Sequence, residues 1–183
     1  CGVKIKHTLQ PNPSWMAKEI NLPNHVIQRI ISPYMVLIPG ASMGHAEKRW
    51  PHYDQLASWL KKHSFQAYTV PGPNEMELCR SFKHAEMLTD GERFLNFFEL
   101  ATILKDARFI IGNDTGPTHL GAHLGVPGLA LFSGHLPAEL TGIQHSKFSH
   151  MENIDLRQLS LERITRHIRE TLPDNDPCPK SFS

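Results

Sequence analysis

An alternation of strand-like runs with amphipathic segments constrains the fold of this chain more than any other feature of its sequence. Runs with the length of strands lie at residues 35–38, 66–70, 86–88, 108–112 and 128–132. Between them, apolar residues recur at helical spacing. Nearly all-apolar strands that alternate with helices indicate a parallel sheet covered on both sides. The sequence therefore predicts an α/β fold, a Rossmann-like parallel sheet with helices on both faces.

The expected helices occupy the intervals between these strands. Their predicted ranges are 24–31, 51–63, 75–83, 94–105, 115–124 and 160–171. The helix over 94–105 shows the strongest pattern, because apolar residues three and four apart are typical of one helical face. The residues of this pattern are Phe94, Phe97, Phe98, Ala101 and Leu104. After the last predicted strand, which ends at residue 132, a polar stretch broken by Gly and Pro extends to about residue 155. We interpret this stretch as a connection.

The length of the chain and the positions of its prolines predict the domain organisation. A chain of 183 residues with 40% hydrophobic residues fits one globular domain. We expect a proline-punctuated lead-in over 1–34, the domain over 35–172 and a proline-rich, mobile tail over 173–183. Because translation does not start with Cys1, we interpret the chain as a piece of a longer protein, with a mature lipoprotein as the alternative.

Charge and cysteine content exclude several classes of partner. Nineteen basic residues against eighteen acidic ones leave no field to attract nucleic acid or an anionic membrane. Cys1, Cys79 and Cys178 are too widely spaced for a metal pair or a disulfide framework, which favours a reducing compartment. His119 and His123 lie one turn apart, but no glutamate or third ligand accompanies them, so we predict no metal site. Neither a GxGxxG nor a P-loop pattern is present.

The loop at 113–119 is the most informative candidate site. It follows a buried strand and leads directly into a helix, with Gly116 allowing close approach and Pro117 suited to a helix start. The first amides of a helix lie at the positive end of its dipole and bind phosphate well. An alternative stays open at this point, in which Asp114 or Thr115 merely caps the helix.

Two further loops leave the same edge of the predicted sheet. The first carries Ser42 and the cations Lys48 and Arg49, which can neutralise a pyrophosphate or simply form a solvated pair. The second carries Glu75 and Glu77, either of which can bind ribose hydroxyls or favour a helix dipole. In open parallel sheets, ligands bind outside the carboxyl ends of the strands, where these loops meet.

Together these segments resemble glycosyltransferase family 9, the ADP-heptose:lipopolysaccharide heptosyltransferases. The matching stretches are IPGAS at 38–42, EKRWP at 47–51, IGNDTGPTHLGA at 111–122 and LGVPGLALF at 124–132. The family has a two-domain GT-B fold, and the resemblance covers its C-terminal, donor-binding half. It implies an inverting transferase that takes heptose or a related sugar from an ADP-sugar donor and needs no metal or other cofactor.

The resemblance also implies roles for individual residues. Lys48 matches the phosphate-contacting lysine, Asp114 the aspartate near the donor sugar, and Thr115 and Gly116 the amides on the pyrophosphate. His119 matches the family's histidine, and Ser42 belongs to the same donor site. Glu75 or Glu77 would bind the ribose, with Glu77 preferred.

This sequence departs from the family in two respects. Leu136 stands where the family usually has Asp, which affects recognition of the donor sugar. The catalytic base and the acceptor surface belong to the family's N-terminal domain, so no catalytic residue is assigned here. The implied acceptor is the lipopolysaccharide core, and the implied location is cytoplasmic, at the inner face of the bacterial inner membrane with at most peripheral association. Alternatives are a non-catalytic nucleotide-sugar module, one half of a two-chain enzyme, or another GT-B-like enzyme such as an epimerase.

Overall fold

One parallel sheet organises the part of the chain that the structure describes. The computed structural model describes residues 13–17, 22–41, 49–134, 141, 143 and 146–172. Six strands lie in the order β3-β2-β1-β4-β5-β6, and every neighbouring pair among them is parallel. They are β1 (Tyr34–Ile38), β2 (Gln66–Thr69), β3 (Glu86–Met87), β4 (Phe109–Asn113), β5 (Gly128–Ser133) and β6 (Phe148–Asn153). The predicted α/β, Rossmann-like class is confirmed.

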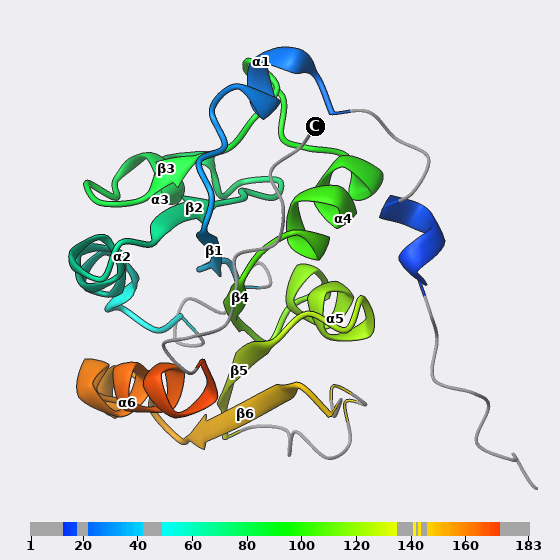
Figure 1. Ribbon diagram of the computed structural model, residues 1–183. Helices are drawn as coiled ribbons and strands as arrows, with labels where there is room; N and C mark the ends of the chain where they lie inside the picture. Colours follow the sequence, from blue (N-terminus) through cyan, green and yellow to red (C-terminus); the bar gives the residue numbers. More distant parts are fainter. Residues whose placement is uncertain are drawn as a thin grey trace, which may run out of the picture.

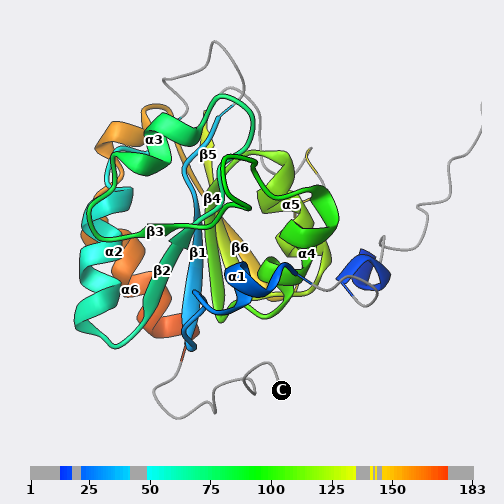
Figure 2. The ribbon, with the colours of Figure 1, turned by 90° about the horizontal axis from the view of Figure 1, so that it is seen from above.

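Helices cover both faces of this sheet (Figures 1 and 2). They are η1 (Pro13–Ala17), α1 (Asn24–Ile27), α2 (Tyr53–Lys62), α3 (Met76–Arg80), α4 (Phe97–Lys105), α5 (Gly116–His123), η4 (Leu156–Gln158) and α6 (Leu161–Thr171). Seen along the sheet, α4 and α5 lie on one side, whereas α2 and α6 lie on the other.

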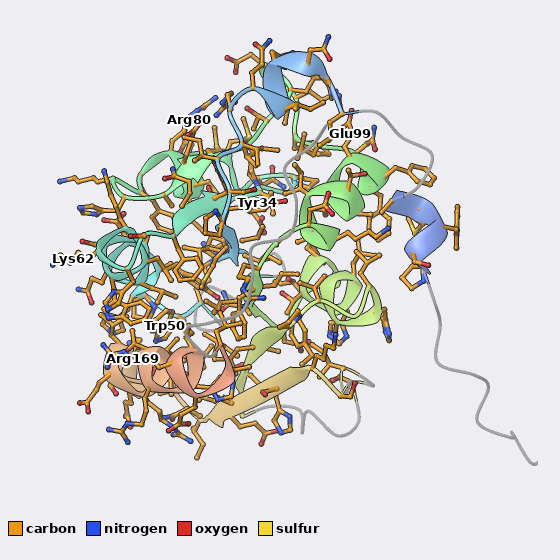
Figure 3. The ribbon with its side chains drawn as sticks, in the orientation of Figure 1. Tyr34, Trp50, Lys62, Arg80, Glu99 and Arg169 are labelled. Carbon is orange, nitrogen blue, oxygen red and sulfur yellow. The ribbon has the colours of Figure 1, made fainter. Side chains whose placement is uncertain are left out.

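Two apolar cores hold these layers together, one on each face of the sheet. Alternate residues of a strand point to opposite faces, so Val36 joins the core beneath α4 and α5 while Leu37 joins the core beneath α2 and α6. Tyr34 and Trp50 lie inside the layers, whereas Lys62 points out into solvent (Figure 3). Because both faces are covered, the central strands are buried along their whole length.

Helix α4 begins later than the apolar pattern predicts. The Asn96 side chain accepts hydrogen bonds from the amides of Phe98 and Glu99, and the Glu99 carboxylate accepts one from the amide of Asn96. This capping box sets the first helical residue at Phe97. The prediction of an apolar face that includes the three phenylalanines is wrong, because Phe94, Phe97 and Phe98 are 40%, 51% and 39% exposed. The helix instead buries Leu100, Ala101, Ile103 and Leu104.

The other corrections concern short or edge elements. The stretch interpreted as a polar connection contains β6, which pairs with β5 along its full length. Its burial is incomplete because it is the edge strand. Phe148 is buried in the core beneath α4 and α5 and Met151 packs against the core beneath α2 and α6, whereas His150 and Glu152 are exposed. Helices α1 and α3 are shorter than predicted, since they end at Ile27 and Arg80. Leu22 and Val26, which belong to the predicted lead-in before the sheet, are buried in the core beneath α4. The predicted boundaries of the domain at residues 35 and 172 stay predictions.

Candidate functional site

The candidate site lies where the chain changes direction across the sheet. From β1 the chain proceeds to β2 on one side, whereas β4 lies on the other side of β1 and leads on to β5. The two strands end together, with Ile38 paired to Gly112. In an open parallel sheet such a switch point leaves a crevice between the loops that diverge from the two carboxyl ends, and this crevice is the usual ligand site.

The amino end of α5 opens into this crevice. Its N-cap is Thr115, whose side chain makes no capping hydrogen bond and instead donates to the carbonyl oxygen of Asn113 at 3.3 Å. The amides of Gly116 and Thr118 belong to the first turn, where an α-helix provides no acceptor. These amides and the helix dipole therefore favour an anion at this position.

Gly116 leaves room for such an anion. A Cβ placed on it would meet no atom within 4 Å among the described residues. Its φ lies outside the left-handed region, so glycine is not required here by the backbone conformation. The open space beside Gly116 is what permits a ligand to approach the backbone closely.

Asp114 and His119 form a hydrogen-bonded pair beside this helix start. His119 Nε2 lies 2.8 Å from Asp114 Oδ1, and both side chains are partly exposed. The Asp114 carboxylate is engaged by His119 and does not cap α5. Thr115 does occupy the N-cap position, but its side chain makes no capping hydrogen bond. Four of the predicted donor-site residues thus lie together between the end of β4 and the first turns of α5: Asp114, Thr115, Gly116 and His119.

The two glutamates of the second loop occupy different places. Glu75 Oε2 accepts a hydrogen bond from the amide of Gly72 at 2.8 Å, and the carboxylate packs directly on Gly40 at the end of β1. Glu77 is exposed in the first turn of α3. Of the two candidates, Glu75 therefore lies at the carboxyl end of β1, although the sequence led us to prefer Glu77.

Three residues singled out in the sequence, Ser42, Lys48 and Leu136, lie outside the described residues. The structure does describe Ala41 and Arg49, which flank the segment that contains Ser42 and Lys48. No geometry is assigned to the three residues.

Asn113 begins the predicted site loop, but the sequence analysis assigned it no role. It ends the buried strand β4, is 1% exposed, and its side-chain amide bonds to the loop that leaves β1 and to the entry of α2. Tyr53 donates its phenolic hydrogen to this amide, and burial raises the pKa of that phenol well above its usual range. The sequence contains one signal for this role, a polar residue at the end of an otherwise apolar strand.

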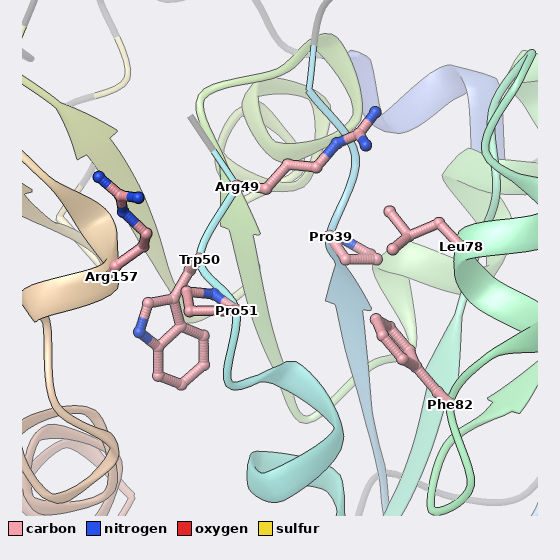
Figure 4. A pocket seen from close by; sticks show the side chains of 7 residues that line it. All are labelled: Pro39, Arg49, Trp50, Pro51, Leu78, Phe82 and Arg157. Carbon is pink, nitrogen blue, oxygen red and sulfur yellow. The ribbon is translucent and has the colours of Figure 1, made fainter. Parts of the chain in front are cut away.

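Two cavities flank the crevice. The first, of about 310 Å³, is mainly apolar and lies between the end of β2 and the amino ends of α4 and α5. The second, of about 480 Å³, lies on the other side of Pro39 and is drawn in Figure 4. Arg49 lines the second cavity, and its buried Nε has no hydrogen-bond partner among the described residues. Arg157, also on its lining, is hydrogen-bonded to the carboxylate of Asp155.

The described residues contain no group of three or more His, Cys, Asp or Glu side chains that could hold a metal ion. His119 lies against Asp114, and no third ligand joins them within the described ranges. None of the described helices has the length and hydropathy needed to cross a lipid bilayer.

The strand order and the helices on both faces of the sheet define a Rossmann-like fold of the kind found in GT-B proteins. The sequence profile of glycosyltransferase family 9 (heptosyltransferase) matches residues 8–163, and the chain belongs to this family. A comparison with curated protein sequences finds no significant match.

Solved structures show the same fold. E. coli heptosyltransferase WaaC with ADP is 22% identical with a TM-score of 0.66, over 81% of this chain and 48% of that one. E. coli ADP-heptose lps heptosyltransferase II is 20% identical with a TM-score of 0.67, over 83% and 52%. Methanocaldococcus jannaschii UDP-GlcNAc 2-epimerase is 10% identical with a TM-score of 0.52, over 94% and 47%. The chain spans about half the length of these structures, and the last of them illustrates that one fold serves several chemistries.

Proposed function

We propose that this chain is the donor-binding half of an inverting glycosyltransferase that takes an ADP-activated sugar, a heptose or a close relative. The observation that carries this proposal is the open start of α5 at the switch point of a chain that belongs to family 9. Among its structural neighbours, one was solved with ADP and another is named for ADP-heptose and lps.

The diphosphate of the donor would lie against α5. By their match to the family, the amides of Thr115 and Gly116 would bind it, and the N-cap side chain makes no capping hydrogen bond that would compete for this position. By their match to the family, Lys48 and Ser42 would join the same diphosphate from the loop that leaves β1. The Asp114–His119 pair, which lies beside the start of α5, is proposed to face the donor sugar.

The nucleoside would extend from the diphosphate towards β2. The apolar cavity there is lined by Gly72 and Leu95 on one side and by Pro117, the second residue of α5, on the other. Its volume of about 310 Å³ suits a planar base. Glu75 accepts a hydrogen bond from the amide of Gly72, which lines this cavity, and its carboxylate lies on Gly40 at the end of β1. We therefore propose Glu75 for the ribose hydroxyls, with Glu77 as the alternative.

The proposed reaction is a displacement at the anomeric carbon of the donor sugar. The acceptor oxygen bonds to that carbon as its bond to the phosphate oxygen breaks, and ADP leaves with the bonding electrons. The amides at α5 and Lys48 would stabilise the negative charge that develops on the leaving diphosphate. This electrostatic role is why we propose a metal-independent reaction. The proton of the acceptor hydroxyl would pass to a base on the other half of the full-length enzyme.

The acceptor and the location belong to the same proposal. We propose the lipopolysaccharide core as acceptor, bound by an N-terminal half, and a cytoplasmic site of action at the inner face of the bacterial inner membrane. A stand-alone binding module, or one half of a two-chain enzyme, is the second candidate, because the chain spans about half the length of its neighbours.

Calorimetric titration with ADP, in the presence and absence of a chelator, tests the proposal. We expect weak binding that the chelator leaves unchanged. Gly116→Val should weaken binding at least tenfold while leaving the melting temperature nearly unchanged, because the new side chain would occupy open space that the ligand needs. No binding up to millimolar ADP, or an absolute need for Mg²⁺, would overturn the proposal.

A further inference from the structure

One buried side-chain amide joins the two loops of the candidate site. Asn113 Nδ2 donates to the carbonyl oxygens of Pro39 at 2.9 Å and Gly40 at 3.0 Å. Asn113 Oδ1 accepts from the Tyr53 hydroxyl at 3.0 Å and from the Trp50 amide at 3.4 Å. The residue is 1% exposed, so a ligand in the crevice would not contact this side chain.

The four contacts use the complete hydrogen-bonding capacity of a primary amide. Such a group has two N–H donors and two acceptor lone pairs, and here each has a partner. An aspartate at this position has the same shape but cannot donate twice. A buried apolar residue would leave two carbonyl oxygens unsatisfied, which is costly in a low-dielectric interior. Asparagine is therefore specified by the surroundings of the side chain.

The contacts join parts of the chain that contribute to one site. Pro39 and Gly40 begin the segment that leaves β1, and Trp50 follows Arg49, at which the described chain resumes. The main-chain carbonyl of Asn113 also accepts the Thr118 hydroxyl at 2.7 Å, which ties the first turn of α5 to the end of β4. A single residue thus sets the loop ends on one side of the crevice relative to the helix start on the other.

We propose that Asn113 is a positioning residue of the donor site. It holds the main chain at Pro39 and Gly40, and with it the surface on which the Glu75 carboxylate lies, at a set distance from the amides of α5. This inference rests on the proposed function, because it assumes that a nucleoside diphosphate spans the crevice between these two sides.

The discriminating variant is Asn113→Asp. An ionised aspartate would place negative charge against the carbonyl oxygens of Pro39 and Gly40 and push them away, whereas the protonated acid can donate to one of them. The titratable and charged groups nearby are the Tyr53 phenol, whose pKa burial raises, the Glu75 carboxylate on Gly40, Arg49 beside Trp50 and the Asp114–His119 pair. These groups are present in the wild type as well, so the ratio of variant to wild-type affinity at each pH isolates the new carboxyl group.

We expect Asn113→Asp to bind ADP at least about tenfold more weakly than the wild type at pH 8, with the ratio returning towards one as the pH is lowered. Tyr53→Phe is the matched control, since it removes one hydrogen bond from the same amide but leaves both donors on the β1 loop. It should lower the melting temperature and leave ADP affinity within about threefold.

Asn113→Ser covers the case in which the aspartate variant does not fold at pH 8. It is neutral, and we expect it to weaken ADP binding about tenfold or more at every pH, because serine is too short to hold both carbonyls. Wild-type affinity in either Asn113 variant, or an equal loss in Tyr53→Phe, would overturn the positioning role. A wild type that fails to bind ADP would instead overturn the proposed function, so the two failures are distinguishable.

Discussion

Gly40→Ala should disable the second loop of the site without unfolding the protein. A Cβ on Gly40 would lie 1.9 Å from Glu75 Oε1 and 2.3 Å from Glu75 Cδ, far inside any real contact. The obstructing atoms are the far end of a flexible side chain, so the carboxylate can swing away. The φ of Gly40 lies outside the left-handed region, and alanine adds no backbone strain there.

The contacts of Glu75 allow both the loss of stability and the loss of ADP affinity to be estimated. Displacing the carboxylate breaks its hydrogen bond from the Gly72 amide, which is 2.8 Å long and partly buried, so stability should fall by about 1 kcal/mol. If Glu75 binds the ribose, losing a charge-assisted contact of about 1.5–3 kcal/mol weakens ADP binding roughly ten- to hundredfold. Glu75→Ala should give the same loss, and Glu77→Ala should stay within about twofold of the wild type.

The assay is a double-mutant cycle read by urea unfolding and by ADP titration. In the Glu75→Ala background the carboxylate is gone, so adding Gly40→Ala should change affinity no further. An additive loss in the double variant would refute this reasoning, because it would mean that the new methyl group acts on something other than Glu75. Loss of affinity in Glu77→Ala with none in Glu75→Ala would assign the ribose to Glu77.

Three further predictions follow from the charges and the extent of the chain. Lys48→Ala should weaken ADP binding by about 1.5–3 kcal/mol, whereas Lys62→Ala, which removes an exposed lysine at the far end of α2, should not in the same titration. Hydrogen bonds from Arg93 hold the pKa of Glu99 below its ordinary value of 4.5. The stability that the Arg93–Glu99 pair adds is therefore fully present above the ordinary pKa of 4.5 and is lost as the pH falls through the depressed pKa of Glu99. Glu99→Gln should accordingly lower the melting temperature at pH 7 and by less at pH 3, and an equal decrease at both would contradict the assignment. The chain alone should show no heptosyl transfer with ADP-heptose and acceptor, and measurable product would require a base within it.

Local chemistry explains which site residues were predictable. A glycine and a proline directly after an apolar strand are enough to predict where α5 begins, and the structure places Thr115 as its N-cap. That an anion binds at this helix start stays a prediction. The capping box at Asn96 and Glu99 is local as well. The sequence analysis did not use it and placed the helix start by the apolar residues Phe94 and Phe97, which are in fact exposed. Periodicity records which residues are apolar, whereas the hydrogen bonds of the cap decide where the helix begins.

The residues that could not be predicted depend on distant partners. Asn113 and Tyr53 are sixty residues apart in sequence, and their contact exists only because β4 lies beside β1 and α2 packs over both. Strand β6 has little apolar signal of its own and forms because the edge of β5 offers unpaired main-chain groups. Glu75 reaches Gly40 only after β1 and β2 are adjacent.

By itself the sequence determined the class of fold, the family and the helix start that directly follows β4, because strand alternation, glycine and proline act over a few residues. Only the tertiary structure decided which glutamate lies at the end of β1 and which buried amide joins the two loops. The physical reason is that a ligand crevice at a switch point is made by strands brought together across the sheet, and the energies that bring them together are the burial of two apolar cores rather than any property of the loops themselves.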